Sequence, residues 1–519
     1  MSGTRKNVLW ADDEIEFLRA HIMFLESRGY NVTPVFSGHD AIALIKENTQ
    51  NFDIVLLDEQ MPGKDGLTTL EEIKELMPDL PVVMVTKSEE EHLMEQALGK
   101  KIDGYLTKPV NPSQILLVCK RLLESKTFIA SELRQQFLRN YSENTTALRG
   151  SLEMPQWIKL YENLARWDTE LDKSDDEGLR QTHAGQKTDS NTEFSAFIEE
   201  RYGHWIKGEN NPPALSVNVL EKHLYPLLQT GEQVYFVIIS GMRLDQYLGI
   251  EETVRKLFSV QRSYYLSVLP TDTRFARASL LGGAYPLDIE AAFPDAWDDD
   301  GKNEAATGKL EEKLLKNHLS KTGLKLPGGF FYTRMTEMES FRAELAKHGK
   351  NRLIVIVADF VDLLTKGSVS SGIAQEIAPD ERALRSVTRT WFENSQLHLL
   401  LKNLARRKCA VVLTSDHGVI FCTRKTEIYG VRQLEPGLRY KFGKQITADE
   451  RRVVALNDPR HFKIPRLKKA PLLLIVKDNY YFTQPENYKE HHLEHRNSFQ
   501  QGGISMEEMI MPFAVFRPL

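Results

Sequence analysis

The sequence predicts an α/β protein in which two sheet-containing regions are joined by a helical connector. Short apolar strands alternate with amphipathic helices over residues 1–125, and buried strands alternate with helices again from residue 231 onward. Such alternation is typical of parallel sheets with helices on both faces. At roughly 150 residues per domain, a chain of 519 residues holds several domains. We predict their limits at 1–125, 126–210 and 211–519.

Composition excludes several classes of protein. Hydrophobic residues make up 41% and charged residues 27% of the chain, so it is neither wholly disordered nor collagen-like. Without an apolar run of about 18 residues, we expect no membrane-spanning helix and no membrane partner. Carboxylates follow soon after the first residues, and the three cysteines lack a metal-binding spacing. These features favour a reducing, cytoplasmic location.

The net charge of −5 is spread unevenly. Residues 1–125 carry 13 Lys and Arg against 21 Asp and Glu, whereas the remainder carries 54 against 51. An acidic first region joined to a nearly neutral body does not indicate general nucleic-acid binding.

The first region reads as a five-stranded sheet of the flavodoxin-like order 2-1-3-4-5. Its first helix carries Ile15, Leu18, Ile22 and Leu25 at helical spacing, and Gly29 ends it. The predicted strands are 7–11, 30–36, 53–57, 81–86 and 103–107.

Five polar side chains follow the ends of these strands. Asp12 and Asp13 follow the first strand and Asp58 ends the third, so their carboxylates share one crevice and repel one another unless a divalent cation binds. Mg²⁺ favours such oxygen ligands. Thr86 and Lys108 end the fourth and fifth strands, from which a hydroxyl and an ammonium can contact a phosphoryl group on Asp58.

The sequences WADDE, IVLLDEQMPGKDG, VMVTKS and GYLTKPV, within residues 6–124, resemble the receiver domain of two-component response regulators. The resemblance implies that Asp58 gains phosphate from a sensor histidine kinase and later loses it. It also implies that Tyr105 is a switch residue and that Thr86 and Lys108 read the phosphoryl group. The Lys108–Pro109 bond is predicted to be cis. The implied Mg²⁺ ligands are Asp12, Asp13, Asp58 and the carbonyl of Gln60.

The middle of the chain shows no catalytic pattern. Residues 128–141, 154–171 and 193–208 are predicted helices, and the polar stretch 172–192 between two of them is predicted to be an exposed loop. A surface insertion is predicted at 295–309. The C-terminal region is predicted to be a second α/β sheet, with strands at 233–240, 262–270, 351–359, 409–416 and 471–478.

The C-terminal region contains VIISGMRLDQY, LPTDTRFARASLLGGAYP, ADFVDLLTK, LTSDHG, LRYKFGK and FQQGGISMEEMIMPF. Together they resemble the PglZ domain of the alkaline phosphatase superfamily, and the whole chain resembles the PorX-like response regulators linked to type IX secretion. The resemblance implies an alkaline-phosphatase-like α/β fold. It further implies a threonine nucleophile activated by two Zn²⁺ ions that clamp the reacting oxygens.

The residues that this chemistry needs are only partly present. Thr273 occupies the nucleophile position, and Asp362, Asp416 and His417 remain as zinc ligands. Three other ligands of the family pattern are replaced, by Ser240, Lys366 and Gln501. Zinc needs three or four N, O or S ligands, so we expect zinc binding to be doubtful and hydrolysis lost or weak. The nearby EHHLEH sequence, with His491, His492 and His495, leaves open another source of imidazole.

A basic stretch accompanies this site. Residues 424–469 hold 13 Lys and Arg against 5 Asp and Glu. We predict that Arg439 and Lys441, with RLKK at 466–469, form a rim for a nucleotide or oligonucleotide, and that Lys366 stands in for a metal's charge and binds phosphate. A solvated basic face is the alternative.

Two functions remain open from the sequence. One is a regulator whose degenerate PglZ effector, a pseudo-phosphodiesterase, signals through protein contacts and through phosphorylation-dependent dimerisation over residues 87–124. A sigma factor or secretion proteins are open as partners. The other is an active zinc-dependent phosphodiesterase under receiver control. Sequence-specific DNA binding is not expected, because no basic recognition helix follows the receiver.

Overall fold

The computed structural model contains two compact units, residues 1–138 and 139–519. It describes residues 5–47, 51–87, 102–123, 125–294, 297, 304–321, 323, 326, 328–335, 345–370, 372–407, 409–431, 437–467, 470–484 and 496–519; side chains at 125–131, 304–307, 366–370 and 372–374 are outside this description.

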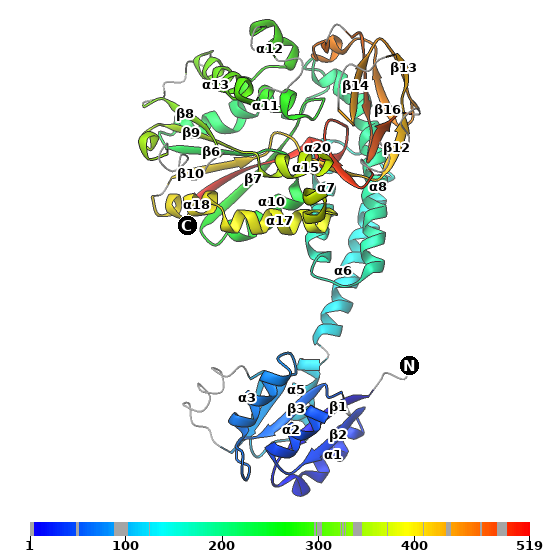
Figure 1. Ribbon diagram of the computed structural model, residues 1–519, viewed down its shortest axis with the longest axis vertical. Coiled ribbons are helices and arrows are strands. Elements are labelled where there is room, and N and C mark those ends of the chain that lie inside the picture. Colours follow the sequence, from blue (N-terminus) through cyan, green and yellow to red (C-terminus); the bar gives the residue numbers. More distant parts are fainter. Residues whose placement is uncertain are drawn as a thin grey trace. The chain divides into compact units, whose positions relative to one another are not determined.

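The first unit is built on a five-stranded parallel sheet in the order β2-β1-β3-β4-β5 (Figure 1). This confirms the flavodoxin-like order predicted from the strand ends. Alternate residues of each strand enter cores on opposite faces: Leu9 and Ala11 on one, Val8 and Trp10 on the other. The strands are β1 Lys6–Ala11, β2 Tyr30–Val35, β3 Ile54–Asp58, β4 Val82–Thr86 and β5 Gly104–Thr107.

Helices cover both faces of this sheet. The predicted first helix begins as a 3-10 turn, η1 Ile15–Leu18, and continues as α1 Arg19–Glu26. α1 and α5 Pro112–Leu123 pack on one face, and α2 Gly38–Glu47 and α3 Gly66–Leu76 pack on the other.

The connector consists of three helices, α6 Ser125–Leu148, α7 Met154–Leu171 and α8 Glu177–Trp205. The predicted loop at 172–192 is wrong, because most of it belongs to the 29-residue helix α8. Asp176 caps this helix by accepting the Leu179 N–H at 3.1 Å. The buried face of α8 carries polar side chains, among them His183, Gln186, Lys187, Ser190 and Asn191. The sequence therefore lacked, over this stretch, the apolar periodicity that predicts a helix.

The second unit contains a six-stranded sheet in the order β7-β20-β10-β6-β9-β8. β6, β8, β9 and β10 are parallel, and β20 runs antiparallel to both of its neighbours. The sequence did not indicate β8 or β20. The strands are β6 Val234–Ile239, β7 Phe258–Leu266, β8 Phe330–Arg334, β9 Leu353–Ala358, β10 Ala410–Thr414 and β20 Ile510–Pro518.

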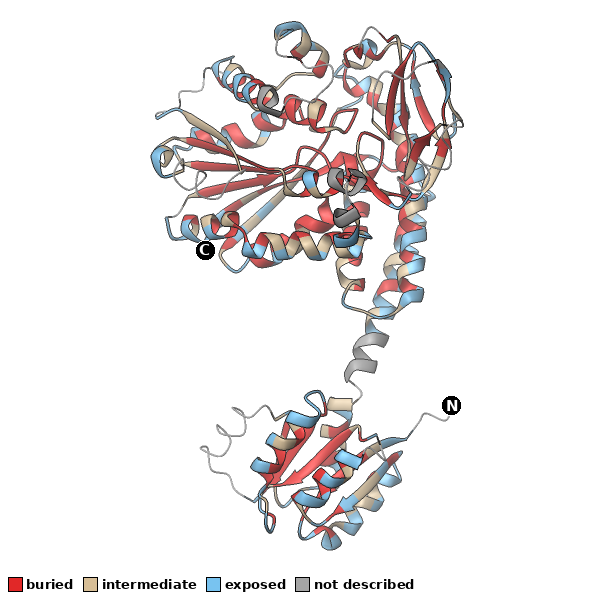
Figure 2. Ribbon diagram, viewed as in Figure 1, coloured by how far each residue is buried: buried red, intermediate tan, exposed pale blue. Residues whose placement is uncertain are grey.

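Helices also cover this sheet on both faces, and the strands between them are buried (Figure 2). One face packs against α7, α10 Leu244–Val254 and α18 Gln396–Arg407. The other packs against α9 Tyr225–Gln229, α11 Thr273–Gly282, α13 Glu304–Lys321 and the π-helix η2 Leu220–Leu224. The expected insertion at 295–309 is partly helical, because 304–309 begin α13; 295, 296 and 298–303 lie outside the described residues.

A group of short sheets, which we call the β subdomain (residues 420–484), follows β10. Its three-stranded sheet has the order β14-β17-β16. The strand predicted at 471–478 therefore exists, as β17, but does not belong to the six-stranded sheet. The strands are β11 Ile420–Cys422, β12 Arg424–Glu427, β13 Tyr429–Val431, β14 Tyr440–Gly443, β15 Gln445–Thr447, β16 Val453–Leu456, β17 Leu472–Val476 and β18 Tyr480–Thr483.

The remaining elements connect these parts. β11 pairs with β19 Ser498–Gln500, outside the subdomain. The others are α12 Pro286–Ala292, α15 Phe360–Ser370, α16 Gly372–Ile377, α17 Glu381–Asn394, η3 Pro459–Phe462 and α20 Met506–Met509. Among the described residues, no helix combines the length and apolar character needed to cross a membrane.

Candidate functional sites

The receiver site is assembled at the carboxyl ends of β1 and β3, where the sequence predicted it. Ligand atoms of Asp12, Asp13 and Asp58 lie within 4.8 Å of one another. Asp12 and Asp58 are buried, whereas Asp13 is exposed. Among the described residues this is the only group of three or more acidic, His or Cys side chains gathered so closely.

Lys108 ties two of these carboxylates together. Its Nζ lies 2.8 Å from Asp12 Oδ2 and 3.1 Å from Asp58 Oδ1, and the Lys108–Pro109 bond is cis, as predicted. Burial and the Asp12 charge raise the pKa of Asp58 to about 6, although Lys108 opposes the shift. The two carboxylates raise the pKa of Lys108 against the opposing effect of its burial.

The receiver site offers the oxygen donors that Mg²⁺ prefers. Receiver domains bind Mg²⁺ through this acidic cluster, and here Asp12, Asp13 and Asp58 would hold the ion together with the Gln60 carbonyl. Bound Mg²⁺ supplies positive charge that stabilises phosphoryl oxygens. Gln60 and Asp13 line a neighbouring cavity of about 500 Å³, which gives a phosphodonor room to approach.

The two residues expected to read phosphorylation have partners that the sequence did not indicate. The buried Thr86 hydroxyl donates to the carboxylate of Glu59, the residue after Asp58. Tyr105 is half-buried and packs against the receiver core. Of the expected dimer surface at 87–124, residues 88–101 and 124 lie outside the described residues.

The second site lies at the carboxyl ends of the six-stranded sheet. Thr273 begins α11, Asp362 lies in the first turn of α15, and Asp416 and His417 follow β10. Thr273 Oγ1 is 3.0 Å from His417 Nε2 and 3.4 Å from Asp362 Oδ1. All four side chains are buried. The fold therefore brings together the residues predicted to be vestiges of a catalytic centre.

His417 has a defined orientation. Its Nδ1 lies 2.9 Å from the Gly418 carbonyl, which can only accept a hydrogen bond. The proton therefore belongs on Nδ1, and Nε2 accepts the Thr273 hydroxyl. The same orientation would present Nε2 to a metal ion.

Asp416 is surrounded by hydrogen-bond donors. Its Oδ1 accepts the backbone N–H groups of Gly241 at 3.3 Å and His417 at 3.0 Å. Its Oδ2 accepts the Ser240 hydroxyl at 3.0 Å, and the Arg277 guanidinium lies 3.8 Å away.

Arg277 was not singled out from the sequence, although it lies in the PTDTRFAR sequence, four residues beyond Thr273. It is buried and bonds Glu311 at 2.7 Å and Asp359 at 2.6 Å. Asp359 also accepts from Arg334 at 2.6 Å. Although burial opposes it, the two guanidinium groups lower the pKa of Asp359. A fixed positive charge therefore stands beside Asp416.

Gln501 and Lys366 complete the predicted set. The Gln501 amide donates to Asp272 at 3.0 Å and to Thr273 Oγ1 at 3.4 Å, so it borders the nucleophile position. Lys366 lies in α15, but its side chain is outside the description, as are His491, His492 and His495.

The predicted basic rim is wrong at Arg439. This guanidinium is fully buried, bonds both carboxylate oxygens of Glu508 at 2.8 Å and donates to the carbonyls of Asp478 and Tyr480. It is a structural residue of the β subdomain. Lys441 on β14 is buried too, and Lys468 and Lys469 lie outside the described residues.

Comparisons with known proteins identify a family for each part of the chain. The model of the BREX system PglZ alkaline phosphatase-like domain matches residues 219–516, more than half of the chain. The chain belongs to the PglZ family. Models of the response regulator receiver domain and the PorX response regulator linker domain match residues 8–120 and 127–206. This PglZ protein therefore has the PorX-like architecture of receiver, linker and PglZ domain.

Individual relatives match the receiver part. The transcriptional regulatory protein ZraR of Salmonella typhimurium is 32% identical over 127 residues, 24% of this chain and 28% of that protein. The chain thus spans little more than a quarter of the length of that relative. The response regulator SaeR of Staphylococcus epidermidis is 30% identical over 165 residues, 30% of this chain and 70% of its own length. This PglZ protein is therefore also a response regulator.

Solved structures of receiver domains are among those similar to the first part of this chain. A CheY-like receiver from Methanospirillum hungatei is 28% identical, with 24% of this chain and 97% of that chain covered and a TM-score of 0.23. The CheX–CheY–BeF₃–Mg complex from Borrelia burgdorferi matches at 29% identity, covering 22% and 87%, with a TM-score of 0.21.

Proposed function

We propose that this response regulator carries a degenerate PglZ effector, a pseudo-phosphodiesterase that holds a phosphorylated ligand without hydrolysing it efficiently. Phosphorylation of Asp58 controls self-association and protein contacts, in a cytoplasmic pathway such as secretion control. The described cysteines Cys119, Cys409 and Cys422 are unpaired, in keeping with a reducing location.

The surroundings of Asp416 carry the proposal. In a two-zinc centre this carboxylate faces cations, but here it faces two N–H groups, the Ser240 hydroxyl and the Arg277 guanidinium. Zinc requires three or four N, O or S ligands in matching geometry. A hydroxyl and a primary amide at two ligand positions do not fit two dications. Without metal activation, Thr273 is an ordinary alcohol of high pKa.

Two guanidinium groups and a helix N-terminus lie at this site, although Glu311, Asp359 and Asp416 beside them leave no net positive charge. Arg277 and Arg334 remain positive at neutral pH and lie beside Asp359 and Asp416. Thr273 begins the ten-residue helix α11, whose N-terminal N–H groups favour an anion. These groups support binding of a phosphate group but supply no second metal to stabilise a leaving oxygen.

An active zinc-dependent phosphodiesterase acting on nucleotides or oligonucleotides is the second candidate. It is favoured by one observation, the alignment of His417 Nε2 on the Thr273 hydroxyl with Nδ1 held by Gly418. That arrangement is the one expected of a zinc-ligating histidine.

Metal analysis paired with hydrolysis of bis-p-nitrophenyl phosphate in added zinc tests the proposal. The wild type is expected to retain less than one zinc per chain after dialysis and to show no turnover above that of Thr273→Val. The matched variant combines Ser240→Asp, Lys366→His and Gln501→His, and it should gain zinc because the ligands are restored. Two zinc ions per wild-type chain, with turnover that Thr273→Val abolishes, would instead establish the phosphodiesterase.

A further inference from the structure

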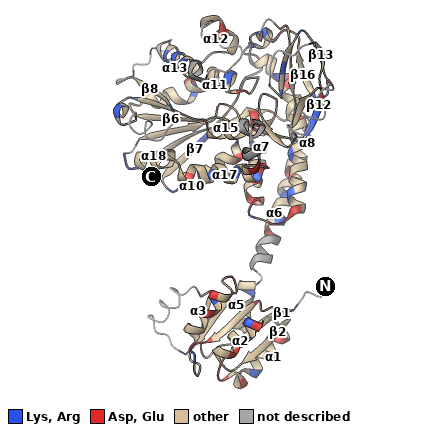
Figure 3. Cartoon of the chain, viewed as in Figure 1, with Lys and Arg blue, Asp and Glu red and all other residues tan. Residues whose placement is uncertain are grey.

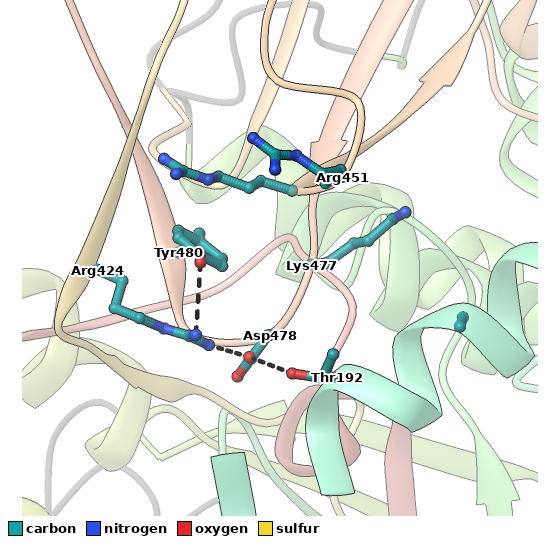
Figure 4. Close-up of a pocket in the computed structure, with 8 residues that line it drawn as sticks. Thr192, Arg424, Arg451, Lys477, Asp478 and Tyr480 are labelled. Carbon is teal, nitrogen blue, oxygen red and sulfur yellow. Dashed lines mark hydrogen bonds and ion pairs between the residues drawn. The ribbon is translucent and has the colours of Figure 1, made fainter. Parts of the chain in front are cut away.

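A second cavity lies between the connector helix α8 and the β subdomain, with a volume of about 350 Å³ (Figure 4). Thr192 of α8 donates a hydrogen bond to Asp478 across it at 3.0 Å. None of its lining residues belongs to the Thr273 site. Its volume lies within the range of about 300–1,000 Å³ typical of small-molecule sites.

The lining of this cavity is basic. Arg424, Arg451, Arg452 and Lys477 contribute positive charge, and Asp478 is the one acidic residue in the lining. Figure 3 shows Lys and Arg residues on β12, where Arg424 begins the strand. Basic residues of the stretch 424–469 therefore do face a cavity, but Arg439 is not one of the residues that line it.

Neighbouring carboxylates outside the lining hold these cations in place. Glu199 of α8 lies 2.5 Å from Lys477, and Asp449 lies 2.9 Å from Arg451 and 3.1 Å from Arg452. The Asp478 carboxylate, which is buried, accepts Arg424. With these three acids the cluster of four cations still keeps a positive excess. An anion in the cavity would compete with the buried Asp478 for Arg424, and with the more accessible Glu199 and Asp449 for the other cations.

Two of the three guanidinium groups, those of Arg424 and Arg452, are held against the Tyr480 ring before any ligand binds. The Cζ atoms of Arg424 and Arg452 lie 4.2 Å and 5.2 Å from the centroid of the Tyr480 ring. Cation–π contacts of this kind restrict long side chains, so less conformational entropy is lost when they meet a ligand. Guanidinium groups also match phosphate oxygens in geometry as well as charge.

We propose that this cavity is a binding site for a small phosphorylated ligand of the size of a mono- or dinucleotide, separate from the Thr273 pocket. The cations come from β12, from the turn before β16 and from the end of β17, and α8 closes the opposite side. Its occupant touches both the connector and the effector. Binding therefore stabilises the docking of these two parts. The stabilising free energy rises with the logarithm of the ligand concentration once that concentration exceeds Kd.

Calorimetric titration of the full-length protein with pyrophosphate and with the dinucleotide pApA tests the site. Arg451→Ala/Arg452→Ala should weaken pApA binding at least about tenfold, because two charge contacts to phosphate are lost. Arg451→Ala alone, at a side chain that is 85% exposed, should weaken it about threefold and leaves the fold intact.

Arg460→Ala is the matched control. Through Nε and Nη2, Arg460 bonds Asp458, the residue two positions before it. Arg451 bonds Asp449 in the same way, but Arg460 does not line the cavity. It should leave Kd within twofold of the wild type. Thr273→Val should leave unchanged the Kd of the binding event that Arg451→Ala/Arg452→Ala weakens, and any other binding event that it removes belongs to the Thr273 pocket of the proposed function.

Several outcomes would overturn the proposal. One is the lack of saturable binding of either probe by the wild type. Another is unchanged affinity in the double variant, and a third is loss, in Thr273→Val, of the binding event that the double variant weakens. Equal affinity for hexaglutamate and pApA would show a general acidic-peptide surface instead of a phosphate site.

Discussion

Two glycines in the characteristic sequences of the PglZ domain are required because neighbouring atoms lie too close for a Cβ. A Cβ on Gly418, in the DHG sequence, would lie 1.9 Å from the Glu507 carbonyl oxygen. A Cβ on Gly503, in GGIS, would lie 2.2 Å from the Arg439 guanidinium. Real Cβ atoms do not approach other atoms so closely, so Gly418 lets the α20 segment pack against the loop that carries Asp416 and His417, and Gly503 leaves room for the buried Arg439.

Gly418→Ala should therefore lower the stability of the second unit by about 2–3 kcal/mol, because the obstructing atom belongs to the backbone and cannot rotate away. Gly249→Ala is the control: it lies within α10 with nothing within 4 Å of the added Cβ, so it should be neutral or stabilise by up to about 1 kcal/mol. Calorimetric unfolding of the two full-length variants measures both changes in stability. A melting temperature of Gly418→Ala equal to that of Gly249→Ala would contradict the packing explanation.

At the scale of elements, α8 shows where sequence reasoning reached its limit. The receiver strands and their polar ends were predictable because an apolar strand followed by a polar residue is a local pattern. The Thr273 site was predictable only because the chain resembles characteristic sequences of the PglZ domain, since the residues of this site are far apart in the chain. The first half of α8, up to residue 192, was missed because its inward face is polar, and its partners on α7, α17 and α20 are fixed by tertiary packing.

That polar face is stabilised by an ionic network around Lys187. Its Nζ lies 3.1 Å from Asp168 on α7, 3.2 Å from Glu381 on α17 and 3.7 Å from Glu507 on α20. Burial raises the pKa of Glu507. Although burial opposes it, Lys187 and its basic neighbours hold the pKa of Asp168 well below its usual value.

Lys187→Met should destabilise the second unit by about 3–5 kcal/mol at pH 7, because it leaves buried carboxylates without their cation. Asp168 has a lowered folded-state pKa, so its stabilising contribution is present above its unfolded pKa of about 3.9 and is lost as pH falls through the folded value. The difference between variant and wild type should therefore shrink below about pH 4. Lys173→Met, at an exposed ion pair, should change the stability by less than about 0.5 kcal/mol. Unfolding enthalpies and midpoints at pH 7 and pH 3.5 measure this, and a pH-independent loss would contradict the electrostatic cause.

At the scale of the whole molecule, we expect phosphorylation to rearrange the receiver, because Thr86 and Lys108 already have partners that a phosphoryl group on Asp58 would disturb. The Thr86 hydroxyl bonds Glu59, and Lys108 is held by Asp12 and Asp58. A phosphoryl group adds about −1.5 to −2 charges at Asp58. We expect its oxygens to compete with Glu59 for Thr86, and we expect a shift of Thr86 to open space beside the half-buried Tyr105.

We expect this rearrangement to double the mass of the protein in solution. Light scattering of the full chain with Mg²⁺ and beryllofluoride, a phosphoryl mimic, should show a dimer, whereas Asp58→Asn should remain at its starting mass. Thr86→Ala should bind the mimic but dimerise less, because the hydroxyl that reports the phosphoryl oxygens is missing. An unchanged wild-type mass would reject self-association as the output. Equal dimerisation of Thr86→Ala and wild type would show that Lys108 alone relays the signal.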